Sequence, residues 1–156
     1  MEEKHADHRL LYVSPKLKKD LRLSGTASVS ISVSSSKPAT NLSVWLVSLP
    51  WQKGKGVKIY DNVITRGWAD PQNHNSIEEG EALVPGEFYQ VTFDLIPYDQ
   101  VIQQGQQIGL MILSSDKEFT LHPKPGIELT INPNLTTITL PIVGGVDAYK
   151  KAVGTD

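Results

Sequence analysis

Four residues in one stretch of this 156-residue chain could recognise a partner. They are Arg66, Trp68, Asp70 and Asn73. A guanidinium offers a planar set of donors to carboxylates or carbonyl groups, and a tryptophan combines a large apolar area with one donor, which is typical of interface hot spots. The two other side chains could fix the local loop or bond across an interface. The stretch therefore predicts a docking surface; the alternative is a local turn with Trp68 packed inward.

Serine hydrolase chemistry has no support in the sequence. It needs an activated serine, a general base and an orienting acid, and α/β-hydrolases place the serine in a G-x-S-x-G turn. No such motif occurs. The four histidines are His5 and His8 near the N-terminus, His74 in a polar segment and His122 beside a proline. We expect them at the surface or in packing roles, and we predict no catalytic residue in this chain.

Metal ligation has little more support. His5 and His8 could hold a divalent ion only if the N-terminal segment were helical, and the acidic group at 78–81 does not fit the calcium-loop pattern D-x-[DN]-x-[DN]-G. The chain has no cysteine, which excludes disulfides and thiolate sites. We predict no metal and no cofactor.

Composition and charge restrict the partners. The chain has the length of one domain, and 15 Lys and Arg against 17 Asp and Glu give a net charge of −2. Nucleic acids and anionic membranes attract a concentrated positive field, which this balance does not supply. No run approaches the ~20 apolar residues of a membrane span, and no secretory signal is visible. We predict a cytoplasmic domain without a nucleic-acid or membrane partner.

Alternation of apolar and polar residues predicts strands. Between Ala27 and Ser34 the odd positions are apolar and the even positions are serine, which predicts a strand with one face in water. The apolar run at 42–49 predicts a strand covered on both faces. Further strands are predicted over 62–68, 88–95, 107–113, 127–131 and 136–140, and short helices over 98–102 and 146–151.

Turn residues divide these runs at the spacing of an all-β domain. Eight or so strands in one domain predict an all-β fold, a jelly-roll β-sandwich of the galactose-binding-domain-like type. We expect a flexible leader at 1–9, the jelly-roll domain at 10–145 and a polar tail at 146–156, with a long loop at 69–83. Asp116 follows two serines and is expected to cap a turn at a strand end.

Sugar binding is the alternative function that such a fold allows. Jelly rolls stack sugars on exposed aromatic rings, and the candidate rings are Trp45, Trp51, Tyr60 and Trp68. Trp45 lies in a wholly apolar run and is expected in the core, whereas Trp51 follows Pro50 at a strand end. The alternative is therefore a free-standing carbohydrate- or ligand-binding jelly-roll module.

Several segments, taken in order, carry a family resemblance. They are LYVSPKL at 11–17, ITRGWADPQN at 64–73, PGEFY at 85–89, GLMILSSD at 109–116 and FTLHP at 119–123. The chain resembles, over roughly 9–145, the C-terminal domain of bacterial Xaa-Pro dipeptidyl-peptidases, which are serine peptidases of the α/β-hydrolase class. Cocaine-esterase-like and amino-acid-ester hydrolases share this jelly-roll domain in looser form.

The resemblance implies a non-catalytic domain that packs on the α/β-hydrolase domain of the same parent chain. The parent enzyme would release Xaa-Pro dipeptides from peptide N-termini through a Ser-Asp-His triad that lies outside this sequence, so no catalytic residue is carried over. We expect the chain to be part of a longer protein, with the loop at 66–76 as its docking surface. A homodimer is the other assembly that the sequence allows.

Overall fold

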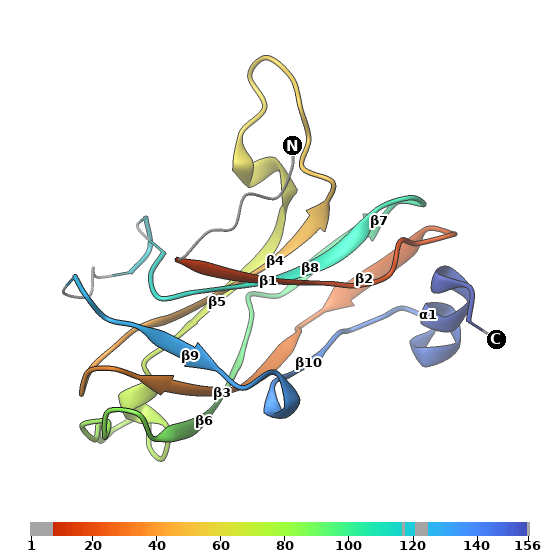
Figure 1. Cartoon of the computed structure of the whole chain (residues 1–156). Helices are drawn as coiled ribbons and strands as arrows, with labels where there is room; N and C mark the ends of the chain where they lie inside the picture. The colour runs from red at the N-terminus through yellow and green to blue at the C-terminus, as the bar shows by residue number, and fades with distance from the viewer. Residues whose placement is uncertain (1–7, 117, 121–124, 156) are drawn as a thin grey trace.

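The computed structural model describes residues 8–116, 118–120 and 125–155, and these residues form ten strands and one α-helix (Figure 1). The strands are β1 (Arg9–Val13), β2 (Leu21–Gly25), β3 (Ser28–Ser35), β4 (Leu42–Leu49), β5 (Val63–Ala69), β6 (Phe88–Asp94), β7 (Tyr98–Ile102), β8 (Gln107–Leu113), β9 (Leu129–Ile131) and β10 (Thr137–Thr139). The helices are α1 (Gly145–Val153) and the short 3₁₀ helices η1 (Ile59–Asn62), η2 (Pro71–Asn73) and η3 (Pro133–Leu135).

Two sheets face each other, and a two-stranded ribbon extends them. One sheet has the order β1-β8-β4-β5, the other has the order β10-β3-β6 with β9 also paired to β3, and the ribbon joins β2 to β7. Every one of these pairs is antiparallel. The predicted all-β sandwich is confirmed.

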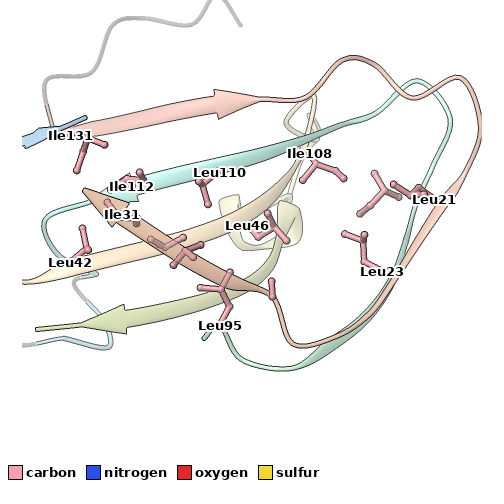
Figure 2. Packing of buried hydrophobic residues seen from close by; sticks show 14 of the residues in the cluster. Leu21, Leu23, Ile31, Leu42, Leu46, Leu95, Ile108, Leu110, Ile112 and Ile131 are labelled. Carbon is pink, nitrogen blue, oxygen red and sulfur yellow. The ribbon is translucent and has the colours of Figure 1, made fainter. Parts of the chain in front are cut away.

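The core lies between the inner faces of the two sheets, as Figure 2 shows. Alternate residues of β4 point inward, and Leu42, Val44 and Leu46 are fully buried there. Val29, Ile31 and Val33 do the same on β3. Burial of such aliphatic side chains stabilises the fold by about 1.5–3 kcal/mol each.

The face of β3 that was predicted to be exposed to solvent is partly buried. Ser32 and Ser34 are buried, because β3 lies between β6 and the short strands β9 and β10. The backbone N–H of Ser32 donates to the Thr136 hydroxyl, and Ser30 exchanges a hydrogen bond with the Thr92 hydroxyl at 2.7 Å. The alternation predicted the strand correctly, but the predicted exposure of its serines was wrong for these two.

The helix expected at 98–102 was also wrong. These residues form β7, which pairs along its whole length with β2, from Tyr98 opposite Gly25 to Ile102 opposite Leu21. Five residues are too few for a helix that is not held by its neighbours, whereas a strand partner satisfies their backbone groups. The helix expected at 146–151 is confirmed as α1.

Helix α1 lies in the segment expected to be a polar tail. Ala152 and Val153 are buried and belong to the main core, so this segment packs on the domain. The predicted leader at 1–9 falls mostly outside the described residues, and Arg9 already begins β1. The domain boundaries stay a prediction.

Candidate docking surface

Arg66 and Trp68 project from the outer face of the β1-β8-β4-β5 sheet. Register places Arg66 opposite Trp45 and Trp68 opposite Ser43, so that these side chains share one face of the sheet. The core residues of β4 occupy the opposite face. Strand β4 is buried at every position except the half-buried Trp45, which confirms that it is covered on both faces. Trp45 itself was expected in the core and lies instead on the outer face.

Gly67 allows β5 to lie close to the end of β6 in the other sheet. A Cβ on Gly67 would lie 2.5 Å from Leu95 Cδ2 and 3.0 Å from the Asp94 carbonyl oxygen. The backbone confirms the close approach, since Ile96 N donates to the Arg66 carbonyl at 2.8 Å and the Thr65 hydroxyl donates to the Ile96 carbonyl. The residue between Arg66 and Trp68 must therefore be small.

Both tryptophans bind one buried carboxylate. Trp45 Nε1 donates to Asp116 Oδ2 at 2.8 Å, and Trp68 Nε1 donates to the same oxygen at 3.4 Å. Asp116 is only 3% exposed. A buried carboxylate is costly unless donors or cations compensate it, and the two indole N–H groups with the nearby Arg66 supply this compensation.

Arg66 lies between two aromatic rings. Its guanidinium carbon is 4.7 Å from the ring centroid of Trp45 and 4.7 Å from that of Phe119. Its Nε is 3.8 Å from Asp116 Oδ2, which is an ion-pair contact and too long for a hydrogen bond. The Arg66 side chain is 14% exposed, so that water screens these interactions only weakly.

The segment after β8 forms a turn that begins at Asp116. The Asp116 carbonyl accepts from Phe119 N at 2.9 Å and from Thr120 N at 2.8 Å, and the Thr120 hydroxyl accepts from Asp116 N. Asp116 does begin a turn, which backbone hydrogen bonds close, and the expected cap by its side chain stays a prediction. One oxygen of this side chain, Oδ2, binds the two tryptophans.

Phe119 covers the cluster and remains in contact with solvent. Its ring centroid is 5.5 Å from that of Trp68, and the side chain is 55% exposed. Residues Trp45, Arg66, Trp68, Asp116 and Phe119 therefore form one unit, which we call the Asp116 cluster.

Asp70 and Asn73 lie just beyond this cluster. The Asp70 carboxylate caps η2 by accepting from Gln72 N at 2.9 Å, and Asn73 N donates to the Asp70 carbonyl at 2.9 Å. Of the four residues singled out in the sequence, the structure brings Arg66 and Trp68 into direct association with Asp116. Asp70 and Asn73 shape the turn that follows β5.

The sequence reasoning missed Asp116 and Phe119 as members of the site. Asp116 is separated from Trp45 by 71 residues and from Trp68 by 48, so that only the strand pairing brings them together. One signal was present: Asp116 follows an apolar strand closely, a position where a carboxylate needs a donor.

Two of the four candidate rings for sugar binding, those of Trp45 and Trp68, belong to the Asp116 cluster. The indole N–H groups of Trp45 and Trp68 are directed to Asp116. Trp51 is half-buried, and nothing is described of the Tyr60 side chain. Within the described residues no group of three His, Asp or Glu side chains could hold a metal ion, and no helix is long and apolar enough to cross a membrane.

Two ionisable features lie on the β2–β7 ribbon. Arg22 donates from Nε and Nη2 to the two Asp99 carboxylate oxygens at 2.9 and 2.6 Å, and this hydrogen bonding holds the pKa of Asp99 below its usual value. Burial raises the pKa of Tyr98 to about 12. The Tyr98 hydroxyl has no hydrogen-bond partner among the described residues.

The fold is that of a domain found in larger hydrolases. An α-amino acid ester hydrolase superimposes with a TM-score of 0.69 at 17% identity, over 87% of this chain and 26% of that one. An aminopeptidase from a marine sediment archaeon, Thaumarchaeota archaeon, gives a TM-score of 0.70 at 15% identity, over 90% of this chain and 26% of that one. These similarities define the class as the β-sandwich that such proteins carry beside other parts of their chains.

Sequence comparison identifies the family. Residues 2–149 match the family described as the X-Pro dipeptidyl-peptidase C-terminal non-catalytic domain, and the chain belongs to this family. A putative Xaa-Pro dipeptidyl-peptidase of Rhodopirellula baltica is 56% identical over 141 residues, which are 90% of this chain and 22% of the relative. The Bacillus cereus protein of the same name is 41% identical over 136 residues, which are 87% of this chain and 22% of the relative.

The family resolves two of the expectations from sequence. The chain is a non-catalytic domain, as the absence of a nucleophile motif predicted. It spans about a fifth of the length of these curated relatives, so that it corresponds to one domain of those longer proteins.

Proposed function

We propose that this domain packs on an α/β-hydrolase domain of the same parent chain and supports the release of Xaa-Pro dipeptides from peptide N-termini. The catalytic serine, aspartate and histidine would belong to that other domain. The support is the family description as a non-catalytic C-terminal domain and the name of the relatives, which are about four times as long as this chain. A cytoplasmic location and a homodimer remain predictions.

The position of Arg9, where β1 begins, favours one docking surface. Arg9, the first residue of β1, lies opposite Leu113 of β8, which lies opposite Ser43 of β4, which in turn lies opposite Trp68 of β5. The chain therefore enters the sheet at the end that carries Trp68. A catalytic domain that precedes Arg9 is tethered beside the Asp116 cluster.

The exposed ring of Phe119 is the observation that carries this proposal. An aromatic side chain that is exposed, yet held in place from below by Arg66 and Trp68, resembles the rigid aromatic anchors of interface hot spots. The exposed Asp70 and the half-buried Asn73 would supply polar groups at the rim. We define the docking surface as Arg66, Trp68, Asp70, Asn73 and Phe119.

Co-production with a hydrolase partner tests this surface. The preceding part of the Rhodopirellula baltica relative would be co-produced with this chain, and the affinity of the purified pair would be measured by calorimetry. We expect Phe119→Ala to weaken the pair by about tenfold or more, since anchors of this kind contribute over 1–2 kcal/mol. Hydrolysis of an Ala-Pro anilide by the pair would be followed in parallel.

Phe88 provides a matched control. It is 51% exposed, close to the value for Phe119, but it lies on β6 in the other sheet. Phe88→Ala should leave the affinity unchanged. Equal effects of the two substitutions, or none, would show that the docking surface lies elsewhere on the domain.

A further inference from the structure

An apolar groove lies between the edge strands of the two sheets, β1 and β10. It has a volume of about 700 Å³ and runs between β1 on one side and β10 with α1 on the other. Its floor is made of the core residues Leu46, Ile108 and Leu110, and its rims include Tyr12 and Thr137. Core side chains therefore line a groove on the surface of the described domain, which costs hydrophobic stabilisation unless the groove is covered.

The strand on one rim has an unpaired edge. Among the described residues β1 pairs with β8 alone, and β1 is the last strand of its sheet. Ser14 N donates to the Ile108 carbonyl, and hydrogen-bonded pairs alternate along an antiparallel ladder. The backbone groups of Tyr12 thus point to β8, and those of Leu11 and Val13 point to the free edge.

The chemistry of the groove suits an extended peptide better than a sugar or an ion. Its lining is mainly aliphatic, with threonine hydroxyls along β10, and it has no carboxylate or cationic side chain. A strand added to β1 would satisfy the outward backbone groups of Leu11 and Val13. Its inward side chains would cover the apolar floor, because alternate residues of a strand face the same side.

The polypeptide that precedes this domain is the occupant that the chain connectivity favours. The family is a C-terminal domain, and the Rhodopirellula baltica relative extends far beyond the matched 22%. A strand supplied by the polypeptide ahead of this sequence can pair with β1 only at its free edge, because β8 occupies the other edge.

We propose that an extended apolar segment of the parent polypeptide, from ahead of residue 1 of this sequence, pairs with the free edge of β1 and fills the groove between β1, β10 and α1. The proposal rests on the proposed function in one respect: it takes the longer parent chain as the source of the segment. It concerns a different surface, because the Asp116 cluster lies on the outer face of the sheet.

Hydrogen exchange measured by NMR tests the pairing. The probe is a set of overlapping peptides that cover the polypeptide preceding the matched region in the Rhodopirellula baltica relative, added to the 156-residue chain. We expect one peptide to slow exchange of the Leu11 and Val13 amides by about tenfold or more. Fusion of that peptide ahead of Arg9 should give the same protection without added peptide.

Substitutions on each rim make the test specific. Val13→Pro removes an N–H that points away from β8, a change that edge strands tolerate, and it should abolish peptide binding while Val13→Thr retains it. Thr137→Arg places a charge in the groove and should weaken binding, whereas Thr130→Arg changes an exposed threonine on β9 outside it. If Val13→Pro does not fold, the comparison of Thr137→Arg with Thr130→Arg still shows whether the peptide binds in the groove.

The outcomes separate this inference from the docking proposal. Phe119→Ala should leave peptide binding unchanged, so that loss of docking alone does not affect the groove. Exchange of Leu11 and Val13 that no peptide slows would overturn the inference. Protection that instead grows with protein concentration, together with a dimer in sedimentation, would also overturn it, by making a second copy of this chain the occupant.

Discussion

Trp45 of β4 donates its indole N–H to the Asp116 carboxylate at 2.8 Å, and this bond ties the segment after β8 to the outer face of the sheet. Asp116 is buried in spite of its charge, and Trp68 and Arg66 complete its surroundings. The exposed Phe119 depends on this arrangement, because its turn begins at the Asp116 carbonyl.

Replacement of Asp116 should destabilise the domain markedly. Asp116→Ala leaves two indole donors without this acceptor and removes a carboxylate that lies 3.8 Å from Arg66, and we expect a loss of about 3–5 kcal/mol in the free energy of unfolding. Urea denaturation followed by tryptophan fluorescence measures it. Asp99→Ala is the control, because the ion pair between Asp99 and Arg22 is exposed and should contribute little. Similar losses for the two variants would contradict the buried role of Asp116.

Arg66→Lys should separate the contribution of charge from that of shape. A lysine keeps the positive charge near Asp116, but it lacks the planar group that lies between the rings of Trp45 and Phe119. We expect a loss of about 1–2 kcal/mol, with a change in the near-ultraviolet circular dichroism of the aromatic residues. Wild-type stability in this variant would show that charge alone is needed.

The strands could be predicted where the local pattern is sufficient. The apolar runs at 42–49 and 107–113 became β4 and β8 with the expected bounds, because a continuously apolar segment of this length needs cover on both faces. β7 was missed, since Tyr98–Ile102 has a weak pattern of its own and is held by its pairing with β2. The predicted exposure of Ser32 and Ser34 was wrong for the same reason, because their burial depends on which strands lie beside β3.

The residues of the candidate site also fall into those that the sequence predicted and those that it did not. Arg66 and Trp68 were found because both stand in one unusual segment of sequence. Asp116 and Phe119 come from a different part of the chain, and the register of β4 against both β5 and β8 brings them together. Register is set by long-range packing, which a single sequence does not report.

Gly67→Ala should be costly in spite of its small size. The added methyl group would meet Leu95 and the Asp94 carbonyl at distances that force β5 and β6 apart. Overpacking of this kind costs about 1–3 kcal/mol. Gly80→Ala is a suitable comparison, because its nearest neighbour is the amide oxygen of Asn73, a side-chain end that can move. A lower thermal stability for Gly80→Ala than for Gly67→Ala would contradict the close approach of β5 and β6.

Tyr98 should make the stability of the domain depend on alkaline pH. Burial raises the pKa of its phenol from 10.0 to about 12 in the folded chain, so that the unfolded chain loses this proton first. The stabilisation from the neutral phenol is therefore complete below pH 10 and is lost as the pH rises towards 12. Tyr98→Phe should remove this part of the alkaline loss.

The same variant tests the buried hydroxyl near neutral pH. Since the Tyr98 hydroxyl has no partner among the described residues, its removal should leave the free energy of unfolding unchanged or raise it by up to about 1 kcal/mol. Urea titrations at neutral pH and at several values between pH 10 and 12 give both quantities. A loss of stability at neutral pH would mean that the hydroxyl has a partner in the folded protein, and an unchanged alkaline loss would mean that other groups cause it.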